Sequence, residues 1–261
     1  MKKLSFNYEP EFAELWDACL HNLLYDKNSY VNEVLELFKK LNITPSSKVL
    51  DTCEATGFIS LYLRQNGYVV DCMDLMSDEI KTFQKNAKNL DVSDRIKQLS
   101  WQEIPSNYPA ESYDFLFCRG NSFIYANGGW NKEQAVNPRE SLNAYEKTLK
   151  IFYNALKTGG YLYIDKFPDN EKPHNDIVAK VSIAGSEEDL VFYTKRFPEK
   201  GYREASMIRR TKDGKEISVP NKTYDLKENQ LENMLLRVGF RQVDRLQLDS
   251  EKNFSVWLAR K

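Results

Sequence analysis

Two aspartates, each at the end of a short apolar run, could hold a ligand at one edge of a sheet. Asp51 ends the run "KVLD" and is followed by a turn that contains a single glycine, Gly57. Asp74 ends the run "YVVDCMD", 17 residues beyond Gly57. An acid at the end of the second strand of a doubly wound sheet is positioned to accept hydrogen bonds from ribose hydroxyls. The spacing therefore predicts a nucleoside-containing ligand across the first two strands.

The turn after Asp51, "TCEATGF", helps to separate the cofactors that could bind there. A pyrophosphate needs close backbone approach and favours G-x-G-x-x-G at a helix N-terminus. Here Glu54 and Ala55 stand where glycines would be expected, and a carboxylate at Glu54 would repel a phosphate. S-adenosylmethionine has no phosphate and carries an ammonium and a sulfonium. The charge of the turn therefore favours S-adenosylmethionine over NAD(P).

The elements that must position these residues alternate between strand-like and helix-like patterns. Alternation at this spacing predicts βαβ units and a parallel sheet with right-handed crossovers. The predicted strands are 48–53, 68–74, 96–101, 113–120 and 161–167, and the predicted helices are 11–24, 28–41, 58–67, 77–90, 138–160 and 227–240. Two final strands, "QVDRLQL" and "NFSVWLARK", complete the sheet.

The alternating pattern is interrupted between about residues 170 and 221, where short β-like runs are separated by polar turns such as "KDGK". These runs predict antiparallel strands inserted into the larger fold. The chain then divides into four parts, expected to be an N-terminal helical lid, a cofactor-binding Rossmann-like core, a β insertion that caps the substrate, and a C-terminal helix with strands. Their boundaries are 1–47, 48–169, 170–221 and 222–261.

At these positions the chain resembles the class I S-adenosylmethionine-dependent methyltransferases. Their first motif stands here as "VLDTCEATG", and the second acid is Asp74 in "DCMDLM". The segments "FCRGNSF" (117–123), "LSWQEI" (99–104) and "YLYID" (161–165) extend the resemblance to the glycine/sarcosine N-methyltransferase group, over roughly residues 12–167. The resemblance implies a Rossmann-like sheet of seven mostly parallel strands, with N-terminal helices and an antiparallel β insertion before the last helix.

The resemblance also implies roles for individual residues. Asp74 would accept the ribose, Ser100 and Trp101 would line the adenine pocket, and the backbone carbonyls of Cys53 and Arg119 would hold the methionine ammonium. Asn121 would face the reacting centre as the catalytic residue, where its amide binds the substrate. The complete set of expected cofactor-binding residues is Asp51, Cys53, Glu54, Ala55, Gly57, Asp74, Leu75, Met76, Ser100, Trp101, Arg119 and Gly120.

This sequence departs from the group's pattern at two positions that bind carboxylates. Near the basic residue that grips the methionine carboxylate, the chain has Asp26 and Lys27, of which only Lys27 could serve. The arginine expected after the fifth strand, for the glycine carboxylate, is Phe167. A small amino-acid substrate held by its carboxylate is therefore not supported.

Large aromatic residues occur in the glycine- and asparagine-rich loop "NSFIYANGGWN" (121–131). Aromatic rings beside a methyl donor suit a planar or cationic acceptor. The expected substrate-binding residues are Asn121, Phe123, Tyr125, Trp130 and Phe167. The alternative is that the aromatic rings of the loop pack under the insertion.

Composition limits the remaining function classes. The 261 residues include 37 basic and 38 acidic side chains, for a net charge of −1, so we expect no nucleic-acid partner. Four cysteines form no C-x-x-C pair and the only histidines are His21 and His174, so we expect neither a metal site nor a histidine-based triad. No apolar run is long enough for a membrane span or a signal peptide, which predicts a cytoplasmic protein and leaves a homo-oligomer open.

These observations predict N-methylation of a small molecule by in-line transfer from S-adenosylmethionine. The cofactor supplies the reactivity, and the protein must align the acceptor and exclude water. Three alternatives remain: O-methylation of a hydroxylated or aromatic acceptor, a catalytically silent methyltransferase-like binding protein, and an NAD(P)-dependent oxidoreductase. The missing glycines and Glu54 disfavour the last.

Overall fold

The computed structural model describes residues 3–7, 10–21, 25–128, 135–170, 172–251 and 253–261. A central sheet of seven strands has the order β11-β12-β6-β5-β2-β3-β4. Its strands are β2 (Lys48–Asp51), β3 (Val69–Asp74), β4 (Lys97–Gln98), β5 (Tyr113–Cys118), β6 (Leu156–Lys166), β11 (Gln242–Leu246) and β12 (Ser255–Arg260). The pairs β2–β3, β2–β5, β3–β4 and β5–β6 are parallel, whereas β12 is antiparallel to both β6 and β11.

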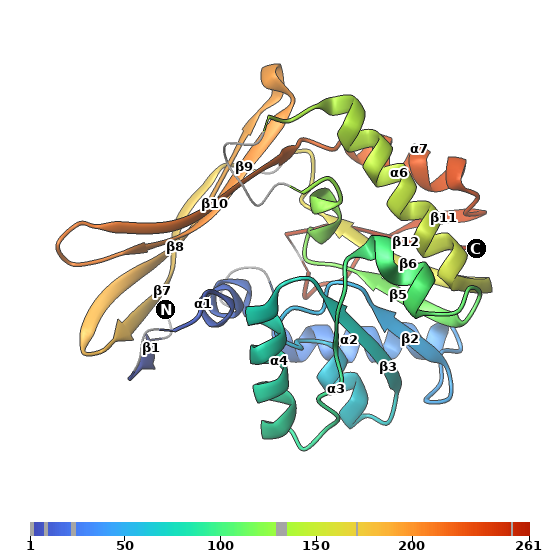
Figure 1. Cartoon of the computed structure of the whole chain (residues 1–261), viewed down its shortest axis with the longest axis horizontal. Helices are drawn as coiled ribbons and strands as arrows, with labels where there is room; N and C mark the ends of the chain where they lie inside the picture. The colour runs from blue at the N-terminus through green and yellow to red at the C-terminus, as the bar shows by residue number, and fades with distance from the viewer. Residues whose placement is uncertain (1–2, 8–9, 22–24, 129–134, 171, 252) are drawn as a thin grey trace.

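Helices cover both faces of this sheet (Figure 1). They are α1 (Phe12–Cys19), α2 (Lys27–Lys40), α3 (Ser60–Gln65), α4 (Ser77–Asn89), α5 (Ile104–Asn107), α6 (Pro138–Ala155) and α7 (Glu228–Val238). Side chains of successive β5 residues point to opposite faces of the sheet, because side-chain direction alternates along a strand. Phe115 and Phe117 belong to the core under α2 and α3, and Leu116 and Cys118 belong to the core under α6 and α7.

A second sheet of five strands lies beside the first, with α1 between them (Figure 1). Its strands are β1 (Lys3–Phe6), β7 (His174–Ile183), β8 (Ser186–Phe197), β9 (Tyr202–Arg210) and β10 (Glu216–Tyr224), in the order β1-β7-β8-β9-β10. The pairs among β7, β8, β9 and β10 are antiparallel, which confirms the inserted antiparallel strands. The N-terminal segment is not wholly helical as predicted, because β1 pairs in parallel with β7.

Two predicted boundaries are wrong. Helix α6 ends at Ala155 and not near residue 160, because Leu156 is extended and pairs with Tyr113 of β5. Gly160 lies where β5 and β6 approach closely, and a Cβ there would be 3.0 Å from the Tyr113 carbonyl oxygen. Strand β4 spans only two residues, because Ser100 begins a capped 3-10 turn, η2 (Trp101–Glu103).

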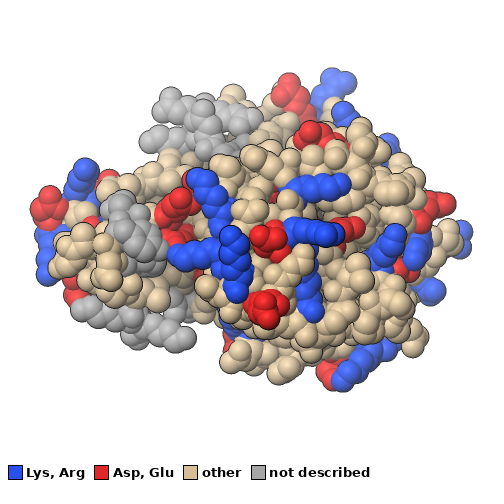
Figure 2. Space-filling model, turned by 60° about the horizontal axis from the view of Figure 1, so that its bottom comes forward, with Lys and Arg blue, Asp and Glu red and all other residues tan. Residues whose placement is uncertain are grey.

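The surface carries charges of both signs. Figure 2 shows lysine and arginine side chains interspersed with acidic ones on the face that it presents. None of the helices in the described part of the chain is long and apolar enough to cross a membrane.

Candidate cofactor-binding site

A cavity of about 220 Å³ opens at the carboxyl ends of β2, β3 and β4. Ligands of doubly wound sheets bind at this edge. Seven of the predicted site residues line the cavity: Cys53, Asp74, Leu75, Met76, Ser100, Trp101 and Tyr125. The structure therefore brings together residues from four separate segments of the chain.

The carboxylate of Asp74 is held at the rim of this cavity by two backbone groups. The N–H of Ala55 donates to its Oδ2 at 2.9 Å, and the N–H of Met76 donates to its Oδ1 at 2.9 Å. A carboxylate oxygen can accept more than one hydrogen bond, so these contacts leave capacity for a further donor. Burial raises the pKa of Asp74, whereas hydrogen bonds from the backbone N–H groups of Met76, Ala55 and Leu75 act in the opposite direction. The arrangement suits a diol such as ribose.

The indole of Trp101 forms one wall of the cavity and is fixed at both ends. Its Nε1–H donates to the Thr52 carbonyl oxygen at 2.6 Å, and its ring lies edge-on to Phe152 with centroids 5.6 Å apart. Ser100 and Glu103 form a capping box that starts this turn, in which the Ser100 N–H donates to Glu103 Oε2 at 2.8 Å. The rigid indole can serve as a stacking surface for a planar base.

The first turn, residues 52–57, differs from the expectation at Glu54. Its side chain is fully buried, does not line the cavity, and has no hydrogen-bond partner among the described residues. Burial, together with the charge of Asp51, raises the pKa of Glu54 well above its ordinary value. Glu54 therefore does not face a ligand in the cavity, contrary to the expectation that its carboxylate would repel a phosphate there.

Ala55 and Gly57 of this turn both have positive φ angles, 52° and 96°. A Cβ at Gly57 would lie 2.4 Å from Leu61 Cδ1, so only glycine fits there. At Ala55 a left-handed conformation costs an L-residue on the order of 1 kcal/mol. The chain thus retains a glycine-like backbone at Ala55 without the glycine, although neither residue lines the cavity.

Behind the cavity, Cys53 joins the first turn to the end of β5. Its Sγ accepts from the Arg119 N–H at 3.1 Å and donates to the Arg119 carbonyl oxygen at 3.3 Å. Arg119 in turn forms an ion pair with Asp51, Nε to Oδ2 at 3.4 Å, in which both side chains are buried. Asp51, Cys53 and Arg119 are therefore joined by hydrogen bonds and one ion pair.

The segment after β5 is held by Asp165 at the end of β6. The N–H of Gly120 donates to Asp165 Oδ2 at 2.7 Å, and that of Asn121 donates to Oδ1 at 2.6 Å. Asn121 has a left-handed backbone, φ 59°, and its Oδ1 accepts from the Phe167 N–H at 3.2 Å. The Asn121 side chain is buried and holds the loop, and it is not among the cavity-lining residues.

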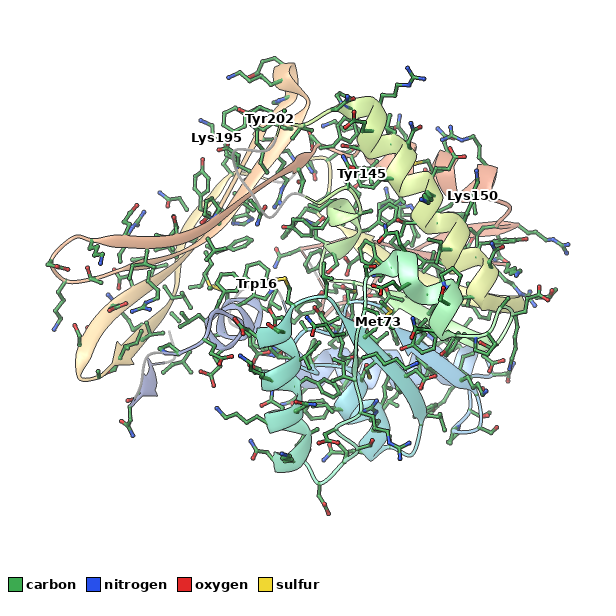
Figure 3. All side chains as sticks on the ribbon, in the orientation of Figure 1. Trp16, Met73, Tyr145, Lys150, Lys195 and Tyr202 are labelled. Carbon is green, nitrogen blue, oxygen red and sulfur yellow. The ribbon has the colours of Figure 1, made fainter. Side chains whose placement is uncertain are left out.

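The predicted substrate-binding aromatics occupy different environments. Phe123 is buried with its ring 5.2 Å from that of Tyr145, and Tyr145 donates from its hydroxyl to the Ile124 carbonyl oxygen (Figure 3). Tyr125 lines the cavity. Trp130 lies outside the described residues.

Phe167 is buried in a chain of aromatic rings that leads to the second sheet. Its ring centroid is 4.8 Å from that of Phe254 and 6.2 Å from that of Phe192, and the Arg203 guanidinium lies 4.4 Å from its centroid. Phe192 also contacts Trp16 of α1, with ring centroids 5.9 Å apart. Figure 3 shows Trp16 on α1, between the two sheets. The second sheet and α1 thus meet the core through Phe167.

Two sets of site residues were missed by sequence reasoning. The cavity is also lined by Thr52, Leu99, Gln102, Ser122, Ala126 and Gly128, and most of these adjoin motif positions in the sequence. The second set is a buried polar cluster in which Tyr30 donates to Tyr163 at 3.3 Å and Tyr163 donates to Glu251. Burial raises the pKa of Glu251, and raises that of Asp165 to about 6. No sequence spacing links positions so far apart.

Comparison with known proteins supports the same fold. A family model for the tellurite resistance protein TehB matches residues 20–127. A glycine/sarcosine N-methyltransferase from Aphanothece halophytica is 27% identical over 159 residues, which cover 61% of this chain and 53% of the relative. The chain has the fold of the class I S-adenosylmethionine-dependent methyltransferases.

Solved structures of this fold family are similar over almost the whole chain. Streptomyces venezuelae DesVI has a TM-score of 0.69 at 16% identity, covering 97% of this chain and 99% of its own. The sugar N-methyltransferase KedS8 from Streptoalloteichus sp. has a TM-score of 0.67 at 14% identity, covering 97% and 95%. At these identities the likeness concerns the fold. The chain spans about half the length of the curated relatives that it matches.

Proposed function

We propose that the protein transfers a methyl group from S-adenosylmethionine to a small molecule, and that the acceptor atom is an amine nitrogen. The observation that carries this proposal is the cavity bounded by Asp74, Ser100 and Trp101. It offers free carboxylate lone pairs for a ribose beside a fixed indole for a base, at the carboxyl edge of the sheet.

In this proposal each residue group has a separate task. Asp74 binds the ribose hydroxyls, and Trp101 and Ser100 line the adenine pocket. Cys53 and Arg119, which are hydrogen-bonded to each other, lie at the amino-acid end. S-adenosylmethionine supplies an electrophilic methyl group on a sulfonium. The protein then has to align the acceptor with the carbon–sulfur bond and exclude water.

Two observations favour nitrogen as the acceptor. The names of the matched relative and of the sugar N-methyltransferase describe N-methylation in those proteins. Transfer to a hydroxyl calls for a general base, and neither histidine lines the described cavity. An amine needs only to be neutral when it attacks, so dipoles and buried carboxyls such as Asp165 can suffice.

We also propose that residues 170–221 cap the acceptor. Support comes from the aromatic rings that connect this insertion to the end of β6: Phe192 on β8 contacts both Phe167 and Trp16. Such a cap would exclude water from the transfer step.

Calorimetric titration with S-adenosylmethionine and with NADH tests the cofactor, and binding of the former alone is expected. Mass spectrometry then follows methyl transfer to a panel of primary and secondary amines and a parallel panel of phenols and alcohols. Methylated amines support the proposal. Methylated hydroxyls favour O-methylation, and cofactor binding with no product in either panel favours a silent binding protein.

A further inference from the structure

The cavity and the buried Arg119–Asp51 ion pair share one residue, Cys53. Cys53 lines the cavity, and its N–H donates to Asp51 Oδ1 at 3.1 Å. Its Sγ accepts a hydrogen bond from the Arg119 N–H. A ligand whose ribose is held at Asp74 and whose base lies at Trp101 can extend its remaining end along Cys53. Arg119 and Asp51 lie directly behind Cys53, where both are buried and neither lines the cavity.

The two members of this ion pair differ in how many hydrogen bonds their side chains make. Asp51 accepts hydrogen bonds from the Cys53 N–H and from the Ser60 hydroxyl, the latter at 3.3 Å. Arg119 Nε lies 3.4 Å from Asp51 Oδ2 but has no hydrogen-bond partner among the described residues. The rest of the guanidinium lies over the Phe58 ring, 5.3 Å from its centroid. A buried guanidinium nitrogen without a hydrogen-bond acceptor is costly, and a second carboxylate would reduce that cost.

The other basic residue considered from the sequence lies elsewhere. Lys27 Nζ is 5.1 Å from the Tyr62 ring centroid and 5.7 Å from that of Phe58. Lys27 lines a separate cavity of about 170 Å³, together with Asp17 and Thr56, and does not line the cavity beside Asp74. Lys27 thus lines a different cavity, whereas Arg119 is hydrogen-bonded through its backbone to Cys53, which lines the cavity beside Asp74.

We propose that the side chain of Arg119 binds the carboxylate of the cofactor's amino-acid end, with Asp51 balancing the neighbouring ammonium. This inference rests on the proposed function. A zwitterion matches an ion pair charge for charge, and a guanidinium offers the forked donors that a carboxylate accepts. In this assignment the carboxylate-binding arginine comes from the end of β5 and not from the N-terminal segment.

The test compares two ligands that differ in the amino-acid end. S-adenosylhomocysteine carries the amino and carboxylate groups, whereas 5′-methylthioadenosine lacks both. Dissociation constants for each are measured by calorimetry on wild-type protein, Arg119→Met, Arg119→Lys and the control Lys27→Met. Arg119→Met is expected to weaken S-adenosylhomocysteine about 30-fold or more, which is typical of truncating a buried charge pair. Binding of 5′-methylthioadenosine should stay within about threefold.

Arg119→Lys keeps the charge, so it should lose less affinity for S-adenosylhomocysteine than Arg119→Met does. This variant also tests the role of Arg119 if the methionine variant folds poorly. Lys27→Met should bind S-adenosylhomocysteine as the wild type does. An equal loss for both ligands in Arg119→Met and Arg119→Lys would mean that Arg119 only supports the fold, and would overturn the inference alone. If wild-type protein binds neither ligand, the proposed cofactor itself is wrong.

Discussion

The backbone N–H of Ala55 donates a 2.9 Å hydrogen bond to Oδ2 of Asp74. This bond ties the first turn of the sheet to the acid at the end of the second strand. It makes the position of the proposed ribose acceptor depend on the conformation of the turn, and it explains why Ala55 matters although its side chain does not line the cavity.

Replacing the acid itself tests the ribose role directly. In Asp74→Asn, one oxygen becomes an amide that would point a donor at the N–H of Ala55 or Met76, and the charge that strengthens a hydroxyl contact is lost. We expect S-adenosylhomocysteine to bind roughly 10- to 100-fold more weakly, since hydrogen bonds to charged groups contribute about 1.5–3 kcal/mol. Calorimetry measures the change.

The matched control for this variant is Asp71→Asn on the same strand. Asp71 accepts from the Tyr113 hydroxyl at 2.7 Å and does not line the cavity at the carboxyl edge. Its replacement should leave the affinity unchanged. Similar losses in both variants would indicate that charge removal perturbs β3 generally and would contradict a specific ribose contact.

Ala55→Gly should stabilise the protein. Ala55 has φ 52°, where an alanine is strained by about 1–2 kcal/mol and a glycine is not. We expect the free energy of unfolding, measured in urea, to rise by about 0.5–1 kcal/mol after the entropy cost of glycine is included. Because the turn holds Asp74, we also expect S-adenosylhomocysteine to bind at least as tightly as in the wild type.

Ala184 provides the control, since it has φ 48° in the turn between β7 and β8 and is exposed. Ala184→Gly should raise stability to a similar extent without changing ligand affinity. A loss of stability in Ala55→Gly would show that the methyl group makes contacts worth more than the backbone strain.

Much of this fold could be predicted because its signals are local. Apolar runs ending in Asp51 and Asp74 located β2 and β3, and the alternation of strands and helices indicated a parallel sheet, which the structure confirms. The end of α6 could not be predicted in the same way. Gly159 and Gly160 follow a helical pattern, but both are backbone hydrogen-bonded to Lys261, and Gly160 lies against the Tyr113 carbonyl oxygen of β5.

The candidate site shows the same division. Asp74, Ser100 and Trp101 follow strands in a known order, so their convergence could be predicted. The environment of Glu54 could not, because its burial beside Asp51 depends on how several segments pack. The contact of Tyr163 with Glu251, 88 residues away, likewise exists only in the folded chain.

Asn121→Gly tests whether Asn121 serves the transfer step. Glycine tolerates φ 59° as asparagine does, so this variant removes the side chain without the strain that Asn121→Ala would add. The Phe167 N–H loses its acceptor in both, and stability should fall by about 1–3 kcal/mol. If Asn121 serves the transfer step, as the resemblance implies, then with an amine identified by the panel kcat falls more than tenfold while S-adenosylhomocysteine affinity changes less than about threefold. Equal losses of turnover and affinity would assign Asn121 to loop support alone.

Glu79→Gln should change how stability depends on pH. Glu79 lies in the first turn of α4, where burial and then the charge of Asp74 raise its pKa to about 8. The folded state thus binds this proton more tightly than the unfolded state, whose pKa is near 4.5. Stability must therefore fall as the pH rises from about 4.5 to 8, by at most about 1.4 kcal/mol per pH unit. Glutamine cannot ionise. The free energy of unfolding of the variant minus that of the wild type should therefore be at least about 1 kcal/mol higher at pH 8 than at pH 5.

Urea unfolding at both pH values measures this difference. The control is Glu140→Gln, in the exposed first turn of α6. If the two variants follow the same pH dependence, the Glu79 carboxyl does not hold a proton in the folded protein at neutral pH.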